Sequence, residues 1–286
     1  LLEGRTLMRI DVRKTYKLFI GGQFPRSESG RSYELLSAKK KFLANPALAS
    51  RKDLRDAVVA ARAASEKWAS ATAFNRSQIL YRIAEMMEGR RSQFIEEVVA
   101  QEGVSVAAAT KEVDAAIDLW VWYAGWCDKV STIYGATNPV SGSFYNFTTP
   151  ESMGVIATFI DGKTALLDVV QGIAPIIAGG NVVVAIAHEK FPLSAMTLAE
   201  VISTSDVPAG TVNILTGKAS ELAPWVGSHM DIDGVDTTGL SAAMHEEIKI
   251  SGADNLKRIS RFNESASPHR ILAFMEAKTV WHPIGI

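Results

Sequence analysis

The side chains that could act as nucleophiles, acids or bases are few and scattered along this chain. The single cysteine, Cys127, lies among aromatic residues in a segment with helical spacing, and no histidine is near it in sequence. A nucleophilic cysteine needs a neighbouring base and an accessible, electropositive setting. This pattern therefore favours core packing. The carboxylates of Glu96 and Glu97, and of Glu246 and Glu247, are adjacent in sequence, so on a helix they diverge and indicate solvated faces.

The histidines show no metal-ligand spacing. His245 precedes two glutamates, which favours a helix surface over a ligand pair. One cysteine excludes a disulfide framework and any cysteine-based zinc site. Neither G-x-G-x-x-G nor a P-loop motif occurs, and Gly179-Gly180 lies between a predicted helix and a strand, which favours a helix C-cap. We expect no metal site. The histidines are His188, His229, His245, His269 and His282.

The composition narrows the class of protein further. The chain has 286 residues with a net charge of −1, 47% hydrophobic and 21% charged residues. These values exclude disorder as the main state and give no basic excess for nucleic acid. A length of 286 residues predicts about two domains. The start shows no signal-peptide pattern, and the uncharged stretch 169–187 is interrupted by Gly and Pro, so we expect a cytoplasmic protein without a membrane span.

Two kinds of periodicity divide the chain. Before residue 135 the apolar spacing is helical, apart from a short strand at 17–20, whereas residues 154–251 alternate buried strands with helices. This alternation predicts a doubly wound parallel α/β sheet, in which a nucleotide would bind. The expected helices are 53–69, 75–89, 92–102, 107–130, 165–178, 194–204, 219–227 and 241–251. The expected strands are 142–148, 154–160, 181–187, 211–215 and 233–237.

Several stretches resemble the NAD(P)-dependent aldehyde dehydrogenase family. Residues 123–129, YAGWCDK, resemble its YAGWADK, and residues 174–184, APIIAGGNVVV, resemble its APALAAGNTVV. Residues 192–195, PLSA, and 207–215, VPAGTVNIL, resemble its PLSA and LPPGVVNIV, and residues 277–281, AKTVW, resemble its closing strand. The resemblance implies an α/β fold: a Rossmann-like, doubly wound parallel sheet of the cofactor domain, with a protruding β oligomerisation element.

The family's functional motifs are altered in this chain. Its PWN motif, whose Asn helps form the oxyanion hole, corresponds to Asp161-Gly162-Lys163, with Lys163 at the Asn position. Its KPAE motif, whose Lys and Glu contact the ribose, corresponds to 186–189, where only Glu189 remains. Its FTGS turn corresponds to 237–240, with Met244 at the turn's second glycine. Where ELGGK brings the general base, the chain reads Ile259-Ser260-Arg261-Phe262-Asn263.

The resemblance also implies that a block is missing before the closing strand. A domain of roughly 150 to 200 residues, which carries the family's catalytic Cys, is absent there, and Cys127 falls at an Ala of the family pattern. We therefore expect no catalytic residue, and only a vestigial cofactor site at Glu189, Gly217 and Gly239. We expect no bound cofactor, with weak NAD or NADP binding as the alternative.

The domain assignment follows the same comparison. We expect an N-terminal helical part of the cofactor-type domain at 1–132, an oligomerisation hairpin at 133–150, the Rossmann-like part at 151–262 and a C-terminal oligomerisation strand at 263–286. In the family, one subunit's protruding strand joins the partner's catalytic-domain sheet, which is β-augmentation. The expected partner is thus a full-length aldehyde dehydrogenase in a hetero-oligomer, with a homo-oligomer as the alternative.

Three functions remain open at this stage. The first is a catalytically inactive structural or regulatory subunit of an active aldehyde dehydrogenase. The second is a stand-alone small-molecule-binding or scaffold protein that reuses the fold. The third is an oxidoreductase with residual activity on aldehydes through Lys163 or Asp161. Lys163 follows a buried strand, so burial would lower its pKa, unless it is a solvated loop lysine.

Overall fold

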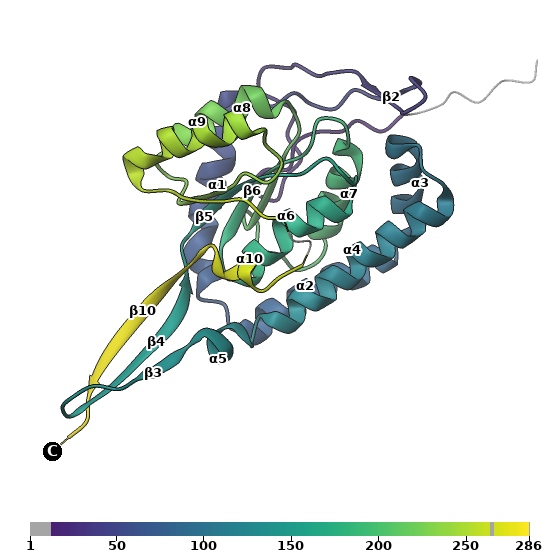
Figure 1. Ribbon diagram of the computed structural model, residues 1–286. Helices are drawn as coiled ribbons and strands as arrows, with labels where there is room; N and C mark the ends of the chain where they lie inside the picture. Colours follow the sequence, from purple (N-terminus) through teal and green to yellow (C-terminus); the bar gives the residue numbers. More distant parts are fainter. Residues whose placement is uncertain (1–12, 264–265, 286) are drawn as a thin grey trace, which may run out of the picture.

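A parallel sheet forms the centre of the molecule (Figure 1). The structure is a computed structural model and describes residues 13–263 and 266–285. Within these residues the strand order is β7-β6-β5-β8-β9, and every neighbouring pair is parallel. The predicted doubly wound α/β fold is therefore confirmed. The strands are β5 (Val155–Phe159), β6 (Val182–Ile186), β7 (Val212–Leu215), β8 (Gly234–Asp236) and β9 (Arg258–Ser260).

Helices cover both faces of this sheet (Figure 1). On one face lie α6 (Leu167–Ala178) and α7 (Pro192–Ile202), with α2 (Ala73–Glu88), α3 (Arg91–Glu102) and α4 (Val106–Trp126) packed outside them. On the other lie α1 (Arg51–Ala69), α8 (Ala219–Ser228) and α9 (Ala242–Gly252), which leads into the short 3-10 helix η1 (Ala253–Asn255). A small hairpin of β1 (Leu35–Leu36) and β2 (Phe42–Ala44) precedes α1.

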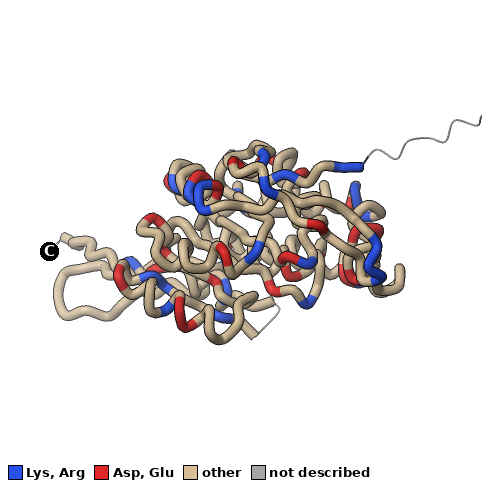
Figure 2. The backbone as a smooth tube through the Cα atoms, turned by 90° about the horizontal axis from the view of Figure 1, so that it is seen from above, with Lys and Arg blue, Asp and Glu red and all other residues tan. Residues whose placement is uncertain are grey.

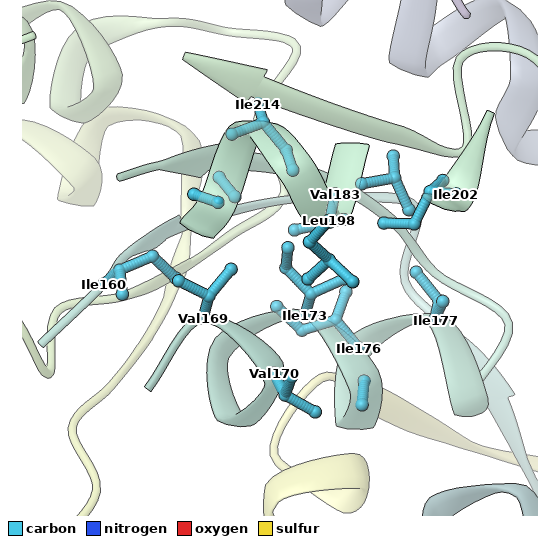
Figure 3. Packing of buried hydrophobic residues seen from close by; sticks show 14 of the residues in the cluster. Ile160, Val169, Val170, Ile173, Ile176, Ile177, Val183, Leu198, Ile202 and Ile214 are labelled. Carbon is cyan, nitrogen blue, oxygen red and sulfur yellow. The ribbon is translucent and has the colours of Figure 1, made fainter. Parts of the chain in front are cut away.

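The core lies between the central strands and α6 and α7. Ile173 and Ile176 of α6 pack near Val183, Leu198 and Ile214, all of which are buried (Figure 3). β-branched residues suit such strands because they pack well on a pleated surface. The stretch 169–187 is thus a buried helix, a glycine turn and a buried strand, as predicted, and Gly179 caps α6. No helix among the described residues is long and apolar enough to cross a membrane, and the cytoplasmic location stays a prediction.

A second, antiparallel sheet projects from the body (Figure 1). It contains β3 (Ala136–Asn138), β4 (Phe144–Ser152) and β10 (Met275–Pro283), in the order β10-β4-β3. Its far end is free of charge, because residues 136–150 and 279–285 contain no Asp, Glu, Lys or Arg (Figure 2). This sheet corresponds to the predicted protruding element, whereas the four domain boundaries stay predictions.

Some predicted elements differ from the structure. The predicted helix 107–130 is two helices, because α4 ends at Trp126 and α5 (Val130–Tyr134) follows a turn. The predicted strand 17–20 is reduced to single bridges from Phe19 to Ile214 and from Ile20 to Gln23. β9 and α10 (His269–Leu272) were not predicted, since both are short and have no clear periodicity.

Candidate functional site

The carboxyl edge of the parallel sheet holds the residues that the sequence singles out. Asp161, Gly162 and Lys163 follow β5, and the 186–189 motif begins at the last residue of β6. Gly217 follows β7, and the 237–240 turn follows β8. The strand order reverses between β5 and β8, and ligands of open α/β sheets bind in the crevice outside such a switch point.

The bend at residues 163–166 leads into α6 at this edge, and the chain's own carboxylates accept from its backbone N–H groups and from that of Leu167. Backbone N–H groups at a helix N-terminus lack partners within the helix and attract anions. Here Asp168 Oδ2 accepts from the backbone nitrogens of residues 163 and 164 at 2.9 and 2.8 Å, Glu102 Oε1 accepts from residue 165 at 2.5 Å, and Glu112 Oε1 accepts from residue 166 at 2.7 Å. These donors are therefore not available to a bound anion.

This carboxylate cluster was not predicted from the sequence. Its members come from α3, α4 and α6, and no motif marks residues that are brought together by packing. Burial raises the pKa of Glu102 to about 7, and the negative charge of Glu112 adds to the rise. Burial also raises the pKa of Asp168. The cluster holds acidic groups beside the switch point, where a nucleotide would bring further negative charge.

Lys163 occupies the place of the oxyanion-hole Asn in the family pattern. Its side chain is 77% exposed, and its Nζ lies 2.8 Å from Asp161 Oδ2. The hydrogen bond and charge of Asp161 raise the pKa of Lys163. Of the two alternatives for Lys163, the solvated loop lysine agrees with the structure, because the side chain is in solvent beside a carboxylate and is not buried. Lys163 is a solvated, protonated loop lysine and not a neutral nucleophile.

His188 follows β6 and packs against the loop after β5. Its ring atoms lie 2.5 Å from where a Cβ on Gly162 would stand. The backbone nitrogen of Lys190 donates to His188 Nδ1 at 3.3 Å, and burial lowers the pKa of the imidazole. A neutral His188 therefore fills space above the β5 loop.

The three predicted cofactor residues all lie at the carboxyl edge. Glu189 is exposed and lines an open cavity of about 620 Å³ together with Tyr33, Gln101, Lys190 and Lys218. Gly217 has φ +151°, a conformation that side chains rarely adopt. Gly239 donates its N–H to the carbonyl of Phe159 at 3.0 Å, and a Cβ there would stand 2.3 Å from the oxygen of Ile160. Their role in cofactor binding stays a prediction.

The residues at this edge do not fit the nucleotide contacts that the family uses. Ile186, at the place of the ribose-binding Lys, is 1% exposed and belongs to the core. Leu240 is buried at the start of α9, and the Ser241 hydroxyl caps that helix by accepting from the backbone of Met244 at 3.3 Å. Of the contacts named in the sequence, only the carboxylate of Glu189 is open to a ribose.

Among the remaining reactive side chains, Cys127 agrees with the predicted core packing, whereas Glu97 does not lie on a solvated face. Its Oε1 accepts from the Thr197 hydroxyl at 2.7 Å, and burial raises its pKa to about 7. Cys127 is buried, and burial raises the pKa of its thiol to about 12. Within residues 13–263 and 266–285, no three His, Cys, Asp or Glu side chains are placed to share a metal ion. His245 corrects the predicted helix surface: its side chain is only 20% exposed, because its Nδ1 hydrogen-bonds the Thr237 hydroxyl at 2.7 Å.

The fold and this edge define a Rossmann-like domain with a projecting β element. The aldehyde dehydrogenase family model matches residues 25–281, and the chain belongs to that family. It is 30% identical over 265 residues to the putative aldehyde dehydrogenase DhaS of Bacillus subtilis, covering 91% of this chain and 53% of that protein. It is 31% identical over 274 residues to an aldehyde dehydrogenase of Aspergillus niger, covering 94% and 54%.

Solved structures agree with this assignment. The NAD+ complex of aldehyde dehydrogenase from Bacillus cereus superposes with a TM-score of 0.80 at 27% identity, over 86% of this chain and 50% of that one. The chain thus spans about half the length of the relatives that it matches. The family match continues into β10, although only residues 261–274 join β9 to β10.

Proposed function

We propose that this chain is a catalytically inactive member of the aldehyde dehydrogenase family, a structural or regulatory subunit that binds a full-length relative. Aldehyde oxidation in this family would need a thiolate that attacks the carbonyl, donors that stabilise the oxyanion, NAD(P) as the hydride acceptor and a base that activates water to hydrolyse the thioester. Two observations together carry the proposal. The backbone donors at the carboxyl edge of the parallel sheet are occupied by the chain's own carboxylates, and the projecting sheet has an edge strand whose outer side has no partner among the described residues.

The chemistry at the carboxyl edge supports inactivity. The only cysteine is buried, with a thiol pKa of about 12. Lys163 replaces the amide oxyanion donor of the family, and its exposed ammonium faces Asp161 Oδ2 at 2.8 Å instead of a substrate oxygen. Loss of one oxyanion donor alone costs about 10² to 10³ in rate.

The residues at the carboxyl edge also bear on cofactor binding. The chain has the fold of relatives that include NAD complexes, so NAD(P) is the ligand to test. The core position of Ile186 and the burial of Leu240 support an affinity far below that of an active enzyme. Millimolar NAD should leave the melting temperature unchanged, whereas a rise that saturates at micromolar NAD would contradict this part of the proposal.

The projecting sheet supports a binding role. Phe144 and Tyr145 of β4 and Trp281 of β10 are exposed large aromatic residues, with Trp281 58% exposed. Aromatic residues are enriched in interfaces, while charged residues are depleted from interface cores. An uncharged aromatic end that extends from the body therefore suits insertion into a partner subunit.

Co-purification tests the proposal. The tagged chain, isolated gently from its native cells and studied by native mass spectrometry, should carry a full-length aldehyde dehydrogenase in fixed stoichiometry. Trp281→Glu should abolish the complex, whereas Trp122→Glu, on the outer face of α4, should leave it intact. Recovery of the chain without such a subunit, or equal effects of both substitutions, would contradict the proposal.

A stand-alone binding protein is the second candidate. The cavity of about 620 Å³ beside Glu189 favours it, since a volume of this size suits a small molecule. Glu34, Glu102 and Glu189 line the cavity together with Lys190 and Lys218, so it suits a ligand that carries both charges, such as a zwitterion. A saturable thermal shift with a zwitterionic metabolite, lost in Lys218→Ala, would favour this function over the first.

A further inference from the structure

The outer edge of β10 is the longest strand edge without a partner in the projecting sheet. β10 pairs with β4 along all nine of its residues, from Met275 opposite Ser152 to Pro283 opposite Phe144. On its other side, no strand pairs with it in the part of the chain that the structure describes. Long open edges are templates for strand addition.

The direction of each backbone group on β10 follows from two contacts. The nitrogen of Ile284 donates to the carbonyl of Ser143 across the β4 side, and Arg258 donates to the carbonyl of Met275 from the other side. Backbone groups alternate in direction along an antiparallel strand. Even-numbered residues therefore bond to β4, while Ala277, Thr279 and Trp281 present both N–H and C=O outward.

We propose that the free chain forms a homodimer in which two copies of β10 pair antiparallel about Thr279. In this register Thr279 faces Thr279 of the second copy, and Ala277 faces Trp281. Each pair then joins two outward-facing residues, so every outward N–H of Ala277, Thr279 and Trp281 meets a carbonyl. In this register Pro283, which has no N–H, faces Met275, whose carbonyl already accepts from Arg258. Centring on Trp281 instead would place Pro283 opposite Thr279 and leave the Thr279 carbonyl of each copy without a donor.

The side chains of β10 complement themselves in this register. On one face the small Ala277 lies opposite the large Trp281, and Thr279 lies opposite its copy, which are favourable cross-strand pairs. On the other face Glu276 lies opposite His282, so a carboxylate meets an imidazole. Lys278 lies diagonal to its copy, but Glu151 of its own chain holds each Lys278 at 3.2 Å, which offsets the repulsion.

The position of β10 leaves room for a second copy. The sheet extends away from the body, and β10 forms one of its two sides (Figure 1). Pairing would join two three-stranded sheets into one continuous sheet and cover two open edges at once. Binding of a full-length subunit to the same edge would compete with this pairing, but the homodimer is tested with the chain alone and does not depend on the proposed function.

Disulfide cross-linking at single sites tests the register. In the proposed dimer of Thr279→Cys, the cysteines of the two copies are directly opposite each other. Their Cα atoms would lie about 5.5 Å apart, which is within the range of a disulfide. Ala277→Cys is the matched control on the same face, because the two copies of residue 277 would be about 14 Å apart. Cys127 is buried and adds little background.

Under mild oxidation at micromolar concentration, Thr279→Cys should form a covalent dimer at least ten times faster than Ala277→Cys. Equal rates, or no dimer from either variant, would overturn the register. Sedimentation velocity of the unmodified chain provides a measurement that does not depend on folding of a variant. A dimer that becomes monomeric in Thr279→Lys, but not in Thr137→Lys on β3, supports the proposal, and a wild-type monomer refutes it.

Discussion

Replacement of Arg270 by methionine should destabilise the chain strongly, because Arg270 is one half of a buried ion pair. Its Nη2 lies 3.3 Å from Asp236 Oδ2, and the two side chains are only 4% and 3% exposed. The pair joins α10 to the end of β8, in the short segment between the two sheets. Without the guanidinium, the buried Asp236 carboxylate keeps the hydrogen bonds that Oδ1 accepts from the backbone nitrogen and the hydroxyl of Thr238, and Oδ2 loses the charge that faces it.

The magnitude follows from the burial of the pair. Loss of one partner of a buried ion pair costs about 3 to 5 kcal/mol, a large part of the roughly 5 to 15 kcal/mol that stabilises a typical protein. Burial raises the pKa of Asp236 while Arg270 opposes the rise, so removing the cation also favours protonation of this carboxyl. Urea unfolding at pH 7, followed by circular dichroism, measures the difference directly.

A matched control separates this effect from the loss of any surface arginine. Arg82 pairs with Glu85 at 2.8 Å, but the two side chains are 42% and 58% exposed. Arg82→Met should therefore leave the stability nearly unchanged, because exposed ion pairs contribute little. The double variant Asp236→Leu/Arg270→Met should regain much of the lost stability, because no unpaired charge stays buried. An Arg270→Met variant as stable as Arg82→Met would refute the reasoning.

Three further results are expected. Burial raises the pKa of Glu97 to about 7, above its usual 4.5, so the folded chain loses stability as pH rises from about 4.5 to 7. In urea unfolding, Glu97→Gln should therefore be about 1 to 3 kcal/mol more stable than wild type at pH 8. At pH 4.5 the two should be nearly equally stable. Gly239→Ala should cost about 1 to 3 kcal/mol because its Cβ would meet the backbone oxygen of Ile160, whereas Gly125→Ala, with no atom within 4 Å, should stabilise α4 by about 0.5 to 1 kcal/mol in the same assay. Cys127 should react with a thiol reagent at pH 8 only as fast as the protein opens, so a rapid reaction in the native state would contradict its burial.

The regular part of the fold was predictable because its signals are local. Continuous apolar runs marked β5 and β6, and helical spacing marked α1. Ser50, directly before α1, is of a residue type that favours N-caps, and its side chain accepts from the nitrogens of Lys52 and Asp53 in a capping box. These features depend on neighbours within a few residues, so the sequence pattern suffices to place them.

The chemistry of the carboxyl edge was only partly predictable. The substitution at Lys163 was visible in the sequence, but its exposure and its pairing with Asp161 depend on the course of the loop. The contacts of Glu102 and Glu112 with the bend that leads into α6 span 63 and 54 residues. Pairing over such separations is decided by tertiary packing, and one sequence gives no sign of it.

The distribution of backbone hydrogen bonds distinguishes the two ends of the molecule. At the carboxyl edge of the parallel sheet, donors that could bind an anion are occupied by Asp168, Glu102 and Glu112. On β10, by contrast, the amides and carbonyls of Ala277, Thr279 and Trp281 face outward without a strand partner among the described residues. A backbone N–H or C=O group that is covered without a hydrogen-bond partner costs free energy, so a strand that pairs with β10 is favoured when water is excluded from this edge. Substitutions that alter the binding partners of this chain should therefore map to the projecting sheet, and those at the carboxyl edge should change its stability.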